Sequence, residues 1–123
     1  MKIRIKENSL RLRLTRSDVD MLAAKGSVQE KINFGEAALQ YSLCSTTDSR
    51  LSASFRANQI TVYFPAAWMI EWISTDKVGY EHQMNLENGE ILHLLVEKDF
   101  TCLDNVQEDQ RDNYPNPLLK KQA

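Results

Sequence analysis

The chain has 123 residues, which fits one domain that can bury a core without disulfides or metals. Its hydrophobic content of 42%, charged content of 26% and formal net charge of -2 are ordinary for a globular protein, and they exclude an overall field that would attract nucleic acid or a membrane. The sequence has no signal-peptide pattern and no apolar run of membrane-spanning length, so we expect a cytoplasmic protein with its two cysteines, Cys44 and Cys102, reduced.

The first elements expected are the two strands of a hairpin. Apolar and charged residues alternate over residues 2–6, and the alternation returns over residues 10–14, which is typical of strands with one buried face. Asn8 suits a positive φ in the turn between them. The exposed side of this hairpin then carries Lys2, Arg4, Lys6, Arg11 and Arg13.

A short helix follows the hairpin. Thr15 and Asp18 have the spacing of a capping box, and Gly26 is a typical residue after a helix end. These signals predict a helix of two to three turns between them, which needs packing against the rest of the protein to be stable.

Two further strands complete the first half of the chain. Residues 28–34 and 39–43 alternate in polarity and predict strands, with Ile32 and Phe34 pointing inward from the first. The polar run over residues 45–50 predicts a linker to the second half.

The second half begins with the same order of elements. Residues 51–55 and 60–64 predict another pair of strands joined by a turn. Pro65 suits the first position of a helix, and Ile70 and Ile73 belong to its expected apolar stripe.

A last hairpin is predicted around the dipeptide Asn88-Gly89, which is typical of a type I′ turn. It joins strands over residues 80–87 and 91–96. Because residues 91–96 are apolar at nearly every position, we expect this strand to be central and buried on both faces.

An offset of fifty residues aligns the apolar positions and the turn asparagine of the two halves. Each half then has the order ββαββ, as pseudo-repeats over residues 2–44 and 51–98, followed by an irregular C-terminal arm over residues 99–123. We predict an α+β fold, mainly antiparallel β. In it, the two pseudo-repeats form one sheet or barrel-like body with two short helices, within a single domain of residues 1–123.

Two resemblances add to this interpretation. The ITVYFP strand and the helix after it resemble the ββαββ swapped-hairpin unit of AbrB-type and MraZ-type transcription regulators, which pair two units into one barrel. That resemblance implies DNA binding through Arg11, Arg13 and Arg16, although the corresponding positions of the second half carry no charge. The segments KIRIKENSLRLRLT and EKDFTCLDNVQEDQRDNYPNP are similar to a family of small uncharacterised bacterial proteins, which implies no activity and no catalytic residues.

Two groups of residues have side chains that can bind metals. In the last hairpin, a type I′ turn makes His82 and His93 diagonal neighbours on one face. Asp104 and Glu108 belong to an acidic cluster after the last strand. Neither group has the spacing of an EF-hand or a zinc site, so we expect ordinary strand histidines, a solvated tail and no metal or other cofactor.

The sequence predicts no catalytic residue. Cys44 ends an apolar strand, and Cys102 has acidic neighbours, which raise a thiol pKa and weaken the nucleophile. No phosphate-binding glycine loop and no nucleophile-elbow motif occurs among the four glycines.

The basic side of the first hairpin is the strongest candidate for binding. It can bind phosphates, it can be solvated, or it can receive the acidic C-terminal arm, and we expect the arm to lie there. The residues of this candidate face are Arg4, Lys6, Arg11, Arg13 and Arg16.

Trp68 and Trp72 lie one helical turn apart. They either contact a partner, for which we consider a second copy of the chain, or are buried between the two halves or under the C-terminal arm. The leading functional hypothesis is a non-catalytic cytoplasmic binding or interaction module. The alternative is an AbrB-like DNA-binding regulator that uses the basic hairpin, and an unrecognised enzyme is the third.

Overall fold

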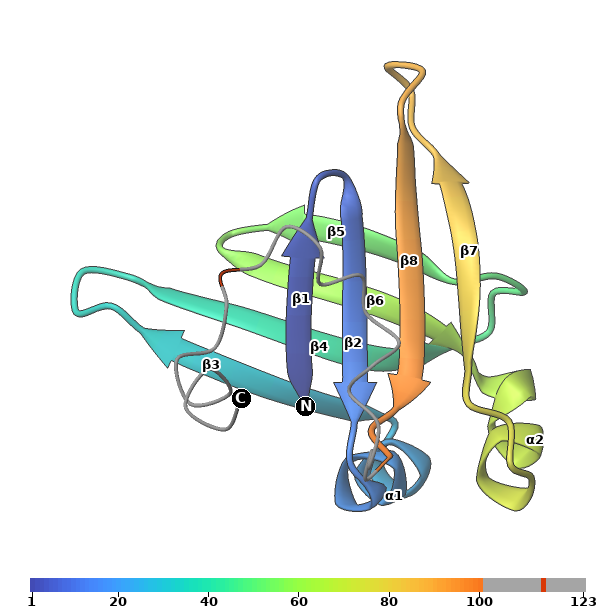
Figure 1. Ribbon diagram of the computed structural model, residues 1–123. Helices are drawn as coiled ribbons and strands as arrows, with labels where there is room; N and C mark the ends of the chain where they lie inside the picture. Colours follow the sequence, from blue (N-terminus) through green and yellow to red (C-terminus); the bar gives the residue numbers. More distant parts are fainter. Residues whose placement is uncertain (101–113, 115–123) are drawn as a thin grey trace, which may run out of the picture.

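Eight strands and two short helices make up the protein in a computed structural model, which describes residues 1–100 and 114 (Figure 1). Both halves have the order ββαββ. A 3-10 turn, Ala66–Trp68, precedes the second helix. In chain order the elements are β1 (Lys2–Lys6), β2 (Ser9–Leu14), α1 (Arg16–Lys25), β3 (Ser27–Asn33), β4 (Ala38–Thr46), β5 (Ser52–Arg56), β6 (Gln59–Pro65), α2 (Met69–Ser74), β7 (Gly79–Asn85) and β8 (Ile91–Lys98).

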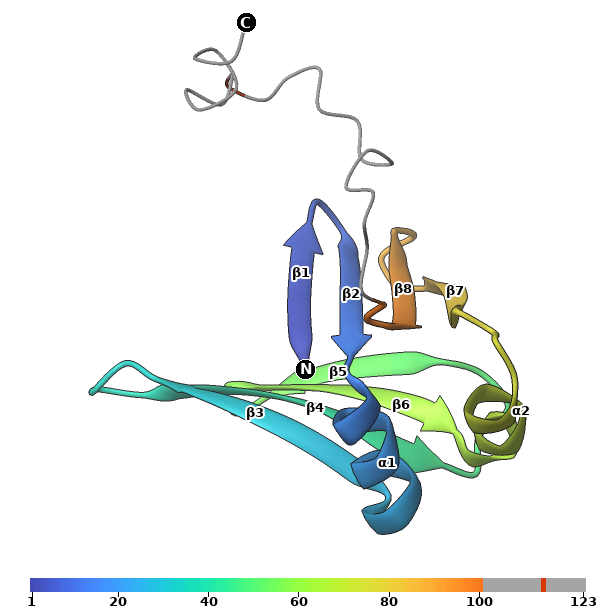
Figure 2. The same ribbon diagram turned by 60° about the horizontal axis from the view of Figure 1, so that its bottom comes forward.

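The strands form two four-stranded sheets, and each sheet takes one hairpin from each half of the chain. Sheet A has the order β1-β2-β8-β7 and sheet B has the order β3-β4-β6-β5. In each sheet the two hairpins meet through a parallel pair, β2 with β8 and β4 with β6. Sheet A rises from one face of sheet B, and its strands run across those of sheet B (Figures 1 and 2). The mainly antiparallel architecture is confirmed, but the described residues form two separate sheets and no closed barrel.

The two parallel strand pairs each have a backbone hydrogen bond to the asparagine of the neighbouring hairpin turn, at equivalent positions in the two sheets. The backbone N–H of His93 donates to the carbonyl of Asn8 at 3.0 Å, and the N–H of Gln40 donates to the carbonyl of Asn58 at the same distance. β1 and β5 also begin fifty residues apart, at Lys2 and Ser52. The origin of the halves by duplication stays a prediction.

The core lies between the two sheets and is closed at one end by aromatic side chains. Phe64 of β6 and Trp72 of α2 are fully buried, with ring centroids 5.1 Å apart. Tyr80 of β7 packs its ring edge against Phe64 at 5.5 Å and stacks on Trp68 at 4.6 Å. These four rings therefore connect sheet A, sheet B and α2.

Two predictions of burial are wrong. Ile32 and Phe34 are 44% and 68% exposed, because the tip of the β3–β4 hairpin extends beyond β1 (Figure 1). β8 is central, as predicted, but its side chains alternate between the core and an open face, so it is not buried on both sides.

The apolar stripe predicted for the second helix is also wrong. Ile70 and Ile73 are 76% and 52% exposed, whereas Trp72 is buried and Trp68 is half-buried. Pro65 is the last residue of β6 and does not occupy the first position of α2. Neither α1 nor α2 has the length and apolar character that crossing a membrane would require.

The predicted capping box of α1 is confirmed and is part of a larger cluster. The Thr15 hydroxyl accepts from the Asp18 N–H, and the Asp18 carboxylate accepts from the Thr15 N–H. The N-terminal ammonium of Met1 is enclosed and lies 2.9 Å from Asp18 and 3.0 Å from Glu30. Burial favours a higher pKa for Asp18, but hydrogen bonds from the ammonium and from Thr15 outweigh it and lower this pKa below its usual value.

We therefore expect Asp18→Asn to reduce the free energy of unfolding by about 1–3 kcal/mol at neutral pH, because it removes a charged hydrogen-bond acceptor. Since the pKa of Asp18 is lower in the folded state, the stabilisation is complete above its ordinary value of 3.8 and disappears as the pH falls through the folded value. Urea unfolding at a series of pH values above and below 3.8 measures the free energy of unfolding of both proteins. Asp20→Asn, an exposed carboxylate on the same helix, is the control, and an equal loss in both variants would contradict the prediction.

Candidate anion-binding face

The outer face of sheet A collects side chains from four strands. In β2 the leucines at alternate positions are buried in the core, so the charged residues between them, and the residues of β1 that pair with these, point outward. The strand pairing then aligns three rows across the sheet. The upper row is Lys6, Ser9, His93 and Gln83, the middle row is Arg4, Arg11, Leu95 and Glu81, and the lower row is Lys2, Arg13, Glu97 and Gly79. We call these three rows together the basic face.

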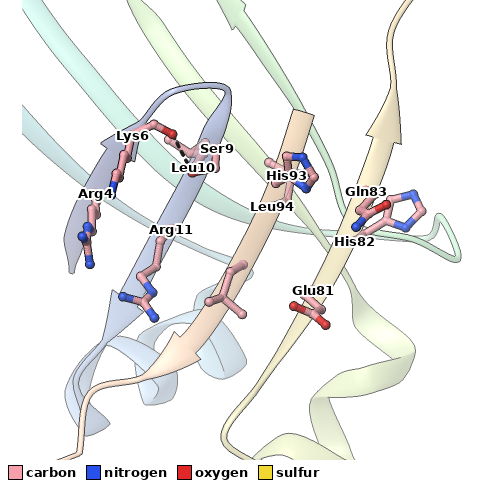
Figure 3. Close-up of a pocket in the computed structure, with 11 residues that line it drawn as sticks. Arg4, Lys6, Ser9, Leu10, Arg11, Glu81, His82, Gln83, His93 and Leu94 are labelled. Carbon is pink, nitrogen blue, oxygen red and sulfur yellow. Dashed lines mark hydrogen bonds between the residues drawn. The ribbon is translucent and has the colours of Figure 1, made fainter. Parts of the chain in front are cut away.

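A hollow of about 570 Å³ lies over the upper and middle rows. Figure 3 shows Arg4, Lys6 and Arg11 on one side of it and Glu81 and Gln83 on the other, with His93 between them. Ammonium, guanidinium and amide donors from three separate parts of the sequence therefore surround one space.

Carboxylates are concentrated at the lower row. Glu97 lies 2.7 Å from the Arg13 Nε and 3.1 Å from the Arg11 Nε, and its side chain is only 12% exposed. Lys2 lies 3.2 Å from Asp99. Because Glu97 holds both guanidiniums from one side, the position of Arg11 beside the hollow is set before any ligand binds.

Four of the five predicted cations lie on this face, and Arg16 does not. It begins α1 and lines a different hollow, together with Asp20 and Asp76. The arm predicted to cover the face begins at Asp99, which pairs with Lys2, and beyond Phe100 it lies outside the described residues except for Tyr114.

β7 and β8 also contribute to this face, and the sequence pattern does not indicate it. His93 lies opposite Ser9, and Glu97 lies opposite Arg13, although more than eighty residues separate them in the chain. Only the parallel pairing of β2 with β8 brings them together, and the alternation of residues within one strand does not indicate its partner.

The two histidines predicted as neighbours lie on opposite faces of sheet A. His93 pairs with Gln83, not with Met84, because the hairpin loop has three residues between Leu86 and Glu90. One residue of register moves His82 to the other side of the sheet. Asp104 and Glu108 lie outside the described residues, and within residues 1–100 and 114 no three His, Cys, Asp or Glu side chains gather as a metal site.

The remaining predicted residues have structural positions. Trp72 is part of the core, and Trp68 is half-buried against Tyr80. The Cys44 thiol is half-buried on sheet B and lies 3.9 Å from the Ser42 hydroxyl. Cys102 lies outside the described residues.

Comparisons with known proteins give one match. A family model described as "Family of unknown function (DUF7009)" matches residues 1–118. No curated protein and no solved structure matches the chain, so the resemblance to AbrB-type and MraZ-type regulators has no support from these comparisons.

Proposed function

Because the chain belongs to this family of unknown function, we propose its role from the geometry: a non-catalytic cytoplasmic module that binds a small anionic ligand on the basic face. The observation that carries the proposal is the hollow of about 570 Å³ between Arg4, Lys6, Arg11 and His93. Its volume is within the range of small-molecule sites. Its donors suit phosphate or carboxylate groups, which accept hydrogen bonds from ammonium and guanidinium groups.

The other sheet of the same protein provides a comparison. At the positions fifty residues after Arg4 and Arg11, β5 and β6 carry Ser54 and Thr61 on the outer face of sheet B. Both sheets have the same strand arrangement, so the strand architecture does not require cations there. Arg56, fifty residues after Lys6, keeps a positive charge on sheet B. Among the cations that line the hollow, only Arg4 and Arg11 therefore have uncharged counterparts on sheet B, and these two arginines support a role in binding.

Duplex DNA is the alternative ligand. A DNA-binding surface neutralises several phosphates with separate cations. Here Glu97 already holds Arg11 and Arg13, Arg16 lies elsewhere, and Glu81 lines the hollow. These features favour a compact anion over a long duplex.

The proposal predicts that Lys6→Gln weakens binding of inorganic tripolyphosphate by about tenfold or more, because one charged hydrogen-bond donor is lost. Isothermal titration calorimetry of the full chain measures the affinity. Lys31→Gln makes the same chemical change on an exposed strand position of sheet B and should leave the affinity unchanged. Equal affinities for the two variants, or binding of duplex DNA alone with a steep salt dependence, would reject the small-anion proposal.

A further inference from the structure

Glu81 lines the hollow of the basic face on the side away from the cations. It ends the middle row, whose order across sheet A is Arg4, Arg11, Leu95 and Glu81. Glu81 is exposed, and it forms no ion pair with any other residue among 1–100 and 114. Because a carboxylate repels an anion, a site for phosphate alone gives no reason for a glutamate at this position.

Leu95 separates the two charged ends of the middle row. It is half-buried on the outer face of β8, between Arg11 on β2 and Glu81 on β7. Its side chain has no hydrogen-bond donor or acceptor, so the part of a ligand that lies over it is held by apolar contact. Figure 3 shows Arg11 and Glu81 on opposite sides of the hollow. The middle row therefore presents cations, an apolar side chain and an anion, in that order.

The spacing of the strands sets the length of a ligand that can reach both ends. Arg11 and Glu81 lie on strands that are separated by β8 alone, so their backbones are about 10 Å apart. Charge-assisted hydrogen bonds of about 2.8 Å at each end cover part of this distance. A short alkyl chain between the two charged groups of a ligand covers the rest.

The cationic end of the hollow suits a dianion. Arg4, Lys6 and Arg11 all line it, and Glu97 fixes the guanidinium of Arg11 from the lower row. A phosphate monoester carries close to two negative charges at neutral pH and has three strong acceptor oxygens. It therefore engages more of these donors than a carboxylate does.

We propose that the ligand of the basic face is a zwitterion, in which a phosphate monoester lies against the cations, a short alkyl chain crosses Leu95 and a primary ammonium group pairs with Glu81. This inference rests on the proposed function, because it requires that the hollow binds an anion. It adds the class of ligand and assigns Glu81 as the residue that determines specificity. A sugar phosphate is the competing ligand, and its hydroxyl groups find no hydrogen-bond partner in the side chain of Leu95.

Isothermal titration calorimetry of the full chain tests the proposal with 3-aminopropyl phosphate and with propyl phosphate, which lacks only the ammonium group. The aminated ligand should bind about threefold to fivefold more tightly, as expected for one exposed ion pair. Glu81→Gln should remove this preference without weakening the binding of propyl phosphate or tripolyphosphate, because it removes a charge that repels both. Glu87→Gln, which removes an exposed carboxylate of the same hairpin outside the hollow, is the matched control and should keep the preference.

Failure of the anion site and failure of the zwitterion give different results. If the unmodified chain binds none of the three phosphates, the hollow is not an anion site, and the proposed function fails together with this inference. If the chain binds tripolyphosphate but does not prefer 3-aminopropyl phosphate over propyl phosphate, the proposed function stands and the zwitterion is rejected. The zwitterion is also rejected if Glu81→Gln keeps the preference, or if glucose 6-phosphate binds more tightly than 3-aminopropyl phosphate.

Discussion

Replacing Trp72 by alanine is expected to reduce the free energy of unfolding by about 3–5 kcal/mol, the range for truncating a large buried aromatic side chain. Trp72 is 0% exposed, and its ring contacts Phe64 and Tyr80, so it joins α2 to both sheets. Its indole N–H also donates to the carbonyl of Val78 at 3.4 Å. The substitution leaves a cavity in the core, because the surrounding side chains relax only partly around the missing ring.

Urea unfolding followed by circular dichroism measures this loss. Ile70→Ala on the same helix is the control, because Ile70 is 76% exposed and its truncation should change stability by less than about 0.5 kcal/mol. A loss below about 1 kcal/mol in Trp72→Ala would mean that the aromatic cluster does not hold the two sheets together in solution.

The contrast between these two residues shows what helix patterns can and cannot predict. The six-residue helix α2 carries Met69, Ile70, Trp72 and Ile73, and pairs of apolar residues at helical spacing point in more than one direction. The sequence therefore left two candidate buried faces. Packing against Phe64 selected the tryptophan side, and this contact spans two elements that the helical period does not relate.

Strands and caps were predicted well because their signals are local. The alternation in residues 2–6 and 10–14 locates β1 and β2, and the capping box of Thr15 and Asp18 locates the start of α1. The prediction of a positive φ at Asn8 was wrong, because the positive φ of 53° in the turn between β1 and β2 belongs to Glu7. In each of these cases the residues that decide the structure lie within four positions of one another.

The candidate site could be predicted only in part, for the same physical reason. Arg4 and Arg11 come from one hairpin, so their shared face follows from period-two alternation. His93 and Glu97 join them through a parallel strand pair formed between distant segments. In the β7–β8 hairpin, Gly89 adopts a φ of 86° in a three-residue loop, and this one-residue difference from a type I′ turn reversed the predicted face of His82.

Gly79 connects the stability of sheet A to the geometry of the basic face, and Gly79→Ala is expected to be strongly destabilising. Gly79 begins β7 opposite Glu97. A Cβ added there would overlap the carbonyl oxygen of Val96 and lie 2.8 Å from the Cα and Cβ of Glu97. Since these atoms belong to the central strand β8, they cannot turn away as a flexible side chain would. We expect a loss of about 2–3 kcal/mol, as for other overpacked positions.

The same substitution should disturb the basic face, because the displaced Glu97 holds Arg11 and Arg13. In Gly79→Ala we therefore expect the NMR resonances of the Arg11 and Arg13 Nε–Hε groups to shift, together with a lower free energy of unfolding. Gly89→Ala is the informative control, since its added Cβ meets nothing within 4 Å, and it should cost about 1–2 kcal/mol through its positive φ alone. That variant should leave the arginine resonances in place. If Gly79→Ala also leaves them unchanged, Glu97 does not depend on the close approach of β7, and the arginine geometry is set within β2 and β8 alone.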